Sequence, residues 1–127
     1  MNYPKVVLKS GKDRPVRNGH PWIFSGAIKS TSNPKDGDFV LVTSNKGEGL
    51  GVGYFNSASQ ITVRMLSRDP KTIIDADFVR TRVSAAIKRR RTLIGTGTNA
   101  YRLIHAEADG LPGIVVDGFD DVLVLQC

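Results

Sequence analysis

The architecture of this chain is set by the segment DFVLVTSNKGEGLGVGYF, which runs from Asp38 to Phe55. Its first part, Asp38–Thr43, alternates in polarity and is rich in β-branched residues, which predicts a strand. Asn45-Lys46-Gly47 has the composition of a hairpin turn, and Gly49–Phe55 is expected to return as the second strand. Three glycines occupy every second position of that strand and project to one face, which leaves room for another backbone or a ring to approach closely.

Three more short strands are expected around this hairpin. The patterns of Tyr3–Lys9, Ala27–Ser30 and Ile61–Leu66 predict them. Between the first two, Ser10–Arg17 is interpreted as a polar, basic loop, and Trp22-Ile23-Phe24 as a single helical turn or a tight bend. About five short strands separated by turns are typical of a small, mostly β, barrel-like domain, which we expect over residues 1–70.

The periodicity changes to that of a helix at Asp75. An apolar stripe then recurs at helical spacing from Val79 to Ile94, and Asp75 is suited to cap the helix N-terminus. The basic run Lys88–Arg91 lies in the last turns, where positive charge suits the helix dipole. We expect most of the run to be solvated, with Arg90 packing its aliphatic stem along the apolar stripe. The sequence therefore predicts a linking helix within 71–98.

The remaining residues, 99–127, are expected to begin a β-rich domain. Tyr101–Ala106, Gly113–Asp117 and Asp121–Leu125 have the character of strands, with a tight turn at Gly118–Asp120. Val122–Gln126 is apolar on both faces, which is typical of a strand in the interior of a sheet, and an apolar edge strand invites pairing. We therefore expect either a fragment of a longer protein or pairing between two copies as a homodimer; the alternative is that the strand tucks under the helix. The predicted fold class is α+β.

The composition narrows the class of protein. The 127 residues contain 18 Lys+Arg and 12 Asp+Glu, a net charge of +6. The charge is uneven: residues 1–29 and 71–94 each carry +5, whereas 95–127 carry −4, which suggests a face for a polyanion. No apolar run approaches the roughly 20 residues needed to span a membrane, the N-terminus lacks the features of a signal peptide, and the single cysteine, Cys127, excludes an internal disulfide. A cytoplasmic protein without a membrane partner is expected.

Several motifs occur in an order and spacing that resemble one known family. They are Gly19–Ile28 (GHPWIFSGAI), Gly53–Asn56 followed by Ser59–Ile61 and Arg64, Tyr101–Ile104, and Glu107–Asp117 (EADGLPGIVVD). Together they resemble the ribosomal RNA cytosine-5 methyltransferases that act on the large subunit. The resemblance extends over essentially all 127 residues.

The resemblance implies an RNA-binding PUA domain, a small pseudo-barrel, followed by a linking helix and the start of a β-rich middle domain. In that family a later Rossmann-type domain binds S-adenosylmethionine and carries the catalytic cysteine. Neither the cofactor loop nor the cysteine motif has a counterpart here, and Cys127 does not lie in such a motif. We therefore expect no catalytic residue, metal or cofactor in this chain, which alone would be inactive. The parent protein is expected to use S-adenosylmethionine. Structured RNA, most naturally ribosomal RNA, is the expected partner.

RNA-binding barrels need cations for phosphates and flat groups for unstacked bases. Arg14, Arg17 and His20 lie on one predicted loop beside Trp22, so they are candidate contacts. Each has another reading: the two arginines are long loop cations, and His20, which precedes a proline, suits a turn residue bonded to backbone. Trp22, between Ile23 and Phe24, is expected in the core.

Three further cations complete the candidate set. Arg64 lies in the middle of a predicted strand and points either toward RNA or toward an acid such as Asp38 or Glu48. Lys46, at a hairpin tip, and Arg89, in the basic run, are candidates whose ordinary role is solvation.

The carboxylates Glu107, Asp109 and Asp117 raise the possibility of a metal or an acid–base site. A turn at Asp109-Gly110 is a sufficient explanation for the acidic residue there, because Asp commonly caps turns with its own side chain. Two functions from different classes remain at this stage. One is an RNA-recognition segment of a methyltransferase, and the other is a standalone PUA-like module for interaction or dimerisation.

Overall fold

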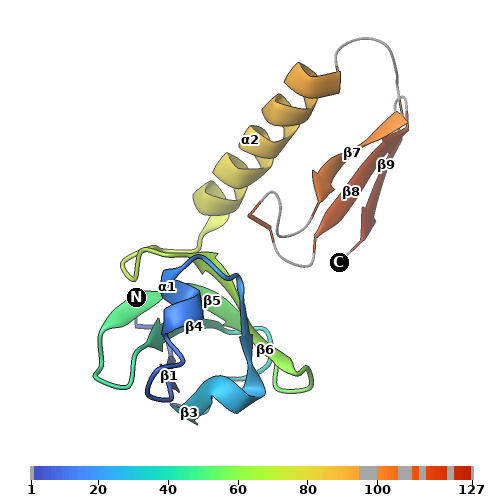
Figure 1. Cartoon of the computed structure of the whole chain (residues 1–127). Helices are drawn as coiled ribbons and strands as arrows, with labels where there is room; N and C mark the ends of the chain where they lie inside the picture. The colour runs from blue at the N-terminus through green and yellow to red at the C-terminus, as the bar shows by residue number, and fades with distance from the viewer. Residues whose placement is uncertain (1, 95–99, 106–109, 112–113, 120–121, 127) are drawn as a thin grey trace. The chain divides into compact units, whose positions relative to one another are not determined.

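The computed structural model describes residues 2–94, 100–105, 110–111, 114–119 and 122–126. The chain divides into two compact units, Met1–Ile73 and Ile74–Cys127, which contain the elements labelled in Figure 1. Among the described residues, no helix is long and apolar enough to cross a membrane.

The first unit is built on one curled sheet, with a short helix and a 3₁₀ turn between its strands (Figure 1). Its elements are β1 (Lys5–Leu8), α1 (Arg14–Arg17), β2 (Trp22–Phe24), η1 (Ser25–Ala27), β3 (Ile28–Thr31), β4 (Phe39–Thr43), β5 (Gly49–Phe55) and β6 (Ile61–Ser67). The six strands follow the order β2-β6-β5-β4-β1-β3. Only the β1–β4 pairing among them is parallel. The predicted strands and the mainly β character of the first unit are confirmed.

The core of this unit follows from the alternation of the strands. Val6 and Leu8 are fully buried on one face of β1, as are Val40 and Val42 on β4. Val63 of β6 joins the same cluster. Alternate side chains of a strand point to opposite faces, so a sheet that curls around one face collects these branched side chains inside it.

The glycine stripe of β5 lies where the backbone of the neighbouring strand β6 approaches β5 closely. A Cβ added to Gly53 would lie 2.5 Å from the carbonyl oxygen of Arg64, and one added to Gly51 would lie 2.2 Å from that of Ser67. Gly51 also has a φ of +150°, and the register of β5 with β6 shifts between Val52 and Gly53. The expected close approach of another backbone is confirmed, and the neighbour is β6.

Two sequence expectations in this unit were wrong. Part of the predicted loop Ser10–Arg17 forms the helical turn α1, which Pro15 favours because its fixed φ suits the first turn of a helix. Trp22-Ile23-Phe24 is the strand β2, not a helical turn or bend, and it pairs antiparallel with β6. Three apolar residues in a row carry no periodicity of their own, so a partner nearly 40 residues away decides their conformation.

The second unit contains α2 (Ala76–Ile94) and a three-stranded sheet, β7-β8-β9, formed by Ala100–His105, Val115–Phe119 and Val122–Gln126. The predicted helix and its cap are confirmed, because the Asp75 carboxylate accepts a hydrogen bond of 2.8 Å from the backbone N–H of Phe78. Ala86 of the helix packs with Ile104 and Leu111 in a small core. The basic run is also as expected: Arg90 is half-buried, whereas Lys88, Arg89 and Arg91 are exposed.

Other expectations for this unit need correction. Val79, predicted on the apolar stripe, is 40% exposed. Gly118 and Phe119 belong to β8, so the turn predicted at Gly118–Asp120 does not begin at Gly118. Strand β9 is exposed at all five positions, which excludes the arrangement in which it tucks under the helix. Residues 95–97, which follow the helical pattern, lie outside the described residues, as do Glu107, Asp109 and Asp120.

Candidate functional site

Three rings gather where α1 is followed by β2, and we call His20, Trp22 and Phe24 the aromatic patch. Trp22 meets His20 and Phe24 edge to face, with ring centroids 6.2 Å and 6.5 Å apart. Trp22 and Phe24 are two residues apart on one strand, so their side chains share a face. Phe24 is 48% exposed and Trp22 is half-buried. The expectation that Trp22 belongs to the core was therefore wrong.

His20 is held by the turn that leads into β2. The backbone N–H of Trp22 donates to His20 Nδ1 at 3.1 Å, and the backbone N–H of His20 donates to the carbonyl of Pro15 at 2.9 Å. The turn contains Gly19, whose φ of +93° is one that glycine adopts readily. The interpretation of His20 as a turn residue bonded to backbone is confirmed, while its exposed ring remains part of the aromatic patch.

A pocket of about 410 Å³ lies beside these rings. Besides the aromatic patch, it is lined by Lys12, which precedes α1, and by five apolar residues of α1, β2 and η1: Pro15, Val16, Ile23, Gly26 and Ala27. One cation, Lys12, stands among these lining residues. An apolar, aromatic hollow with a cation in its wall is suited to a flat group that carries or adjoins negative charge.

Two arginines of the first unit border the aromatic patch and its turn. The guanidinium of Arg64 lies over the Trp22 ring, 5.7 Å from its centroid, because Trp22 and Arg64 are register partners of β2 and β6. Arg68 donates a hydrogen bond to the carbonyl of Arg17 at the end of α1. A Cβ added to Gly19 would lie 3.6 Å from the Arg68 guanidinium. The arrangement puts positive charge next to the rings.

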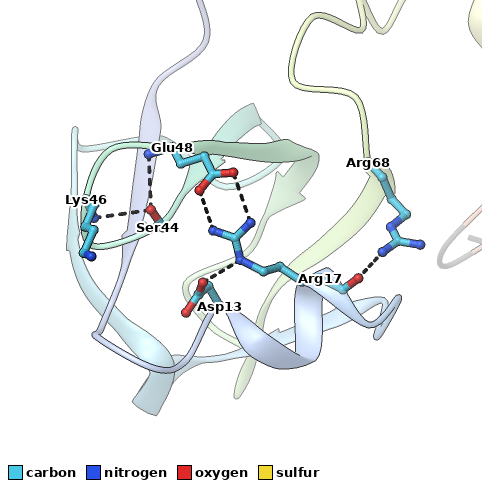
Figure 2. A network of polar contacts seen from close by, with 6 residues as sticks. All are labelled: Asp13, Arg17, Ser44, Lys46, Glu48 and Arg68. Atoms are coloured by element: carbon cyan, nitrogen blue, oxygen red, sulfur yellow. Dashed lines mark hydrogen bonds and ion pairs between the residues drawn. The ribbon is translucent and has the colours of Figure 1, made fainter.

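Arg17 faces a different set of partners. Its Nη1 and Nη2 donate to the two carboxylate oxygens of Glu48 at 3.1 and 2.7 Å, and its Nε donates to Asp13 at 2.6 Å (Figure 2). These hydrogen bonds raise the pKa of Arg17, the Glu48 pair most strongly, and lower the pKa values of Glu48 and Asp13. The Glu48 backbone N–H is in turn held by Ser44 Oγ at 3.2 Å. Three of the five N–H donors of Arg17 are thus occupied within the protein.

The other predicted contacts are distributed over both units. Arg14 and Lys46 are exposed in the first unit, Lys46 at the tip of the β4–β5 hairpin. Arg89 is exposed on α2 in the second unit. Sequence reasoning did not nominate Lys12 or Arg68, nor did it treat Trp22 and Phe24 as exposed rings. An i, i+2 pair of aromatic residues was the available signal for the rings, but it becomes meaningful only once the segment is known to be a strand.

The carboxylates of the second unit give no metal site in the part of the chain that the structure describes. Asp117 receives a hydrogen bond of 2.8 Å from Arg102 Nε. Arg102 Nη1 also lies 3.1 Å from His105 Nδ1. Among the described residues, no group of three metal-ligating side chains occurs.

Comparison with known proteins assigns the fold of the first unit. Residues 6–68, which comprise nearly all the strands of the curled sheet, match the family model described as "PUA-like domain". The first unit is therefore a PUA-like domain.

The chain as a whole is similar to proteins named "Ribosomal RNA large subunit methyltransferase I". It is 43% identical over 125 residues to the one from Shewanella denitrificans and 40% identical over 124 residues to the one from Escherichia coli. The alignments cover 96% of this chain but only 32% and 31% of those proteins. The chain is thus homologous to these methyltransferases and spans about a third of their length.

Solved structures share the fold. A Streptococcus mutans protein assigned as a SAM-dependent methyltransferase superposes with a TM-score of 0.82 at 18% identity, covering 98% of this chain and 32% of its own. A protein assigned as a methyltransferase and complexed with SAH gives the same values. At this identity the likeness establishes the fold alone.

Proposed function

We propose that this chain is the RNA-binding part of an S-adenosylmethionine-dependent methyltransferase that modifies large-subunit ribosomal RNA. The observation that carries the proposal is the aromatic patch, which lies beside an apolar pocket and is bordered by Lys12, Arg64 and Arg68. The similarity to proteins named for ribosomal RNA methylation supports the choice of partner.

The chemistry of the patch suits single-stranded or unpaired nucleotides within a folded RNA. Sequence-tolerant RNA binding combines stacking of bases on aromatic rings with cations that follow the backbone, and each stacked base contributes about 1–3 kcal/mol. Phe24 presents nearly half of its surface, and Arg64 adds a guanidinium plane beside Trp22. A base entering the pocket would stack or pack on these groups, while its phosphates would lie near the cations.

We extend the proposal to the methylation reaction that the longer polypeptide would catalyse. The resemblance of the motifs supports methylation of a cytosine at C5, with S-adenosylmethionine bound elsewhere in a longer polypeptide. The role of the present chain would be to hold the RNA so that the target base reaches the catalytic domain. The chain alone is proposed to have no methyltransferase activity, and work on ribosomal RNA would place it in the cytoplasm.

Titration of a folded RNA hairpin with an unpaired loop tests the proposal. We expect binding at low salt that weakens steeply as salt rises, because neutralised phosphates release counterions. Trp22→Ala and Phe24→Ala should each weaken binding by roughly tenfold, consistent with the loss of one stacked base. Ile73→Ala removes an apolar side chain that is 53% exposed in the same unit but does not line the pocket, and it should leave affinity unchanged. Absence of binding at low salt, or equal losses in all three variants, would exclude this function.

A second candidate is an interaction module that dimerises through β9. Its support is the exposure of Val122, Leu123 and Leu125, which are 55%, 67% and 63% exposed on a strand that pairs with β8. Exposed apolar strands of this kind readily pair with another chain.

A further inference from the structure

The exposed side of α2 carries a concentration of positive charge outside the PUA-like domain. From Phe78 to Ile94 the sequence contains six arginines and lysines and no acidic residue. This excess of charge was visible in the sequence, but only the structure shows which of the six side chains face solvent.

At least three of the six cations are engaged within the second unit. Arg80 Nη1 donates to Asp77 Oδ1 at 2.7 Å. Arg82 Nη1 donates to the carbonyl of Gly110 at 2.6 Å, and its guanidinium lies 4.4 Å from the centroid of the Phe78 ring. Arg90 is half-buried. Because the apolar side of the helix is covered by its own sheet through Ala86, which is fully buried, this helix does not offer the free apolar face that a membrane-surface helix needs.

The solvent side of α2 contains a shallow hollow of about 540 Å³, which we call the α2 hollow. It is lined by Ser84, Ile87, Lys88, Arg91 and Thr92. Lys88 and Arg91 are both exposed and are separated by three positions, so they lie on neighbouring turns of one helix face. Thr92 Oγ1 donates to the carbonyl of Lys88 at 3.0 Å, so this lining side chain is held against the helix backbone.

We propose that the α2 hollow binds the phosphodiester backbone of the same RNA as a second contact point. The proposal rests on the proposed function of the first unit. Lys88 and Arg91 supply positive charge, and the Ser84 hydroxyl can donate a hydrogen bond to a phosphate oxygen. None of the described residues that line the hollow is aromatic, so they offer no ring on which a base could stack. The contact would therefore contribute affinity and orientation without reading the sequence of the RNA.

The neighbouring Arg89 gives this proposal its matched control. It is an arginine on the same helix and is exposed, like Arg91, but it does not line the hollow. Two residues correspond to a rotation of about 200° around a helix, so Arg89 and Arg91 point to different sides. If RNA responds only to the overall charge of the helix, both substitutions should weaken binding, whereas a phosphate site in the α2 hollow requires the larger loss at Arg91.

The experiment measures binding of the whole chain to a folded RNA hairpin with a long duplex stem and an unpaired loop, as a function of salt. Lys88→Gln with Arg91→Gln should weaken binding several-fold and reduce the slope of log affinity against log salt by about two, one for each lost phosphate contact. Arg91→Gln should weaken binding more than Arg89→Gln. Circular dichroism and thermal unfolding of each variant verify that the helix is intact.

The outcomes separate this inference from the proposed function. If Arg89→Gln and Arg91→Gln have equal effects, or the double variant binds like the wild type while Trp22→Ala still loses affinity, the α2 hollow is not a phosphate site and the first unit binds RNA without it. If the wild-type chain binds no RNA at low salt, both proposals fail. If a polyglutamate peptide competes for the α2 hollow as well as the RNA does, its ligand is an acidic chain of any kind and the RNA assignment is overturned.

Discussion

Arg17 and Glu48 are 31 residues apart in the sequence, and the guanidinium of one meets both carboxylate oxygens of the other at 3.1 and 2.7 Å. The pair connects α1 to the residue before β5, and Asp13 adds a third hydrogen bond. A bidentate arrangement of this kind fixes the orientation of the guanidinium plane. The consequence is that Arg17, a candidate RNA contact, cross-links two segments of the PUA-like domain.

The first prediction concerns acid. The Arg17 hydrogen bonds lower the pKa of the Glu48 carboxyl, so the pair stabilises the fold fully where the unfolded carboxylate is ionised, and the contribution is lost as pH falls through the lowered pKa. Glu48→Gln should therefore reduce the melting temperature slightly at about pH 7 and by less at about pH 3. Thermal unfolding at both pH values checks this. An equal reduction at the two values would show that packing, not charge, is what the substitution removes.

The second prediction ranks two neighbouring arginines. Arg14 is exposed, whereas the donors of Arg17 are shared between Asp13 and Glu48 (Figure 2). A guanidinium with two carboxylates beside it attracts a phosphate weakly, since the local charge is no longer positive. Arg14→Gln should therefore weaken RNA binding more than Arg17→Gln, as measured in the hairpin titration. The reverse order would indicate that RNA displaces the internal carboxylates.

Local sequence patterns were sufficient for much of this fold. The hairpin at Asn45–Gly47, the close approach at the glycine stripe of β5 and the helix capped by Asp75 all follow from neighbours within a few residues. The strand β2 did not follow, because its conformation depends on pairing with β6, and a short apolar run has no period by which to recognise it.

The candidate site was harder to predict for the same reason. Charge and residue type identified the basic N-terminal region, but the partner of each cation depends on contacts far along the chain. Arg17 pairs with Glu48. Arg64, for which Glu48 was one of the acids considered, lies over the Trp22 ring. The exposure of Phe24 likewise depends on the strand pairing of β2.

The third prediction tests the glycine stripe. A Cβ at Gly53 would lie 2.5 Å from the Arg64 carbonyl oxygen and 2.8 Å from Val63 Cγ1, whereas one at Gly26 would meet nothing within 4 Å. Neither glycine has a positive φ, so the two alanine variants differ mainly in the space available. Overpacking typically costs about 1–3 kcal/mol. Gly53→Ala should therefore destabilise the PUA-like domain by that amount in chemical unfolding, and Gly26→Ala should be nearly neutral. Equal effects would mean that the β5–β6 contact yields without strain.

The last prediction concerns β9 and decides whether the second candidate function is correct. Leu123 and Leu125 share one face of the strand and are 67% and 63% exposed. If β9 pairs with β9 of another copy, sedimentation of the wild-type chain should show dimers that increase with concentration, and a Leu123→Lys, Leu125→Lys variant should remain monomeric because burying two charges in a paired face is unfavourable. Ile73→Lys changes an equally apolar and 53% exposed side chain in the first unit, so it should leave the dimer intact. A wild-type chain that stays monomeric over the whole concentration range would rule out dimerisation through this strand. RNA binding by that monomer would then leave the first unit as the functional surface.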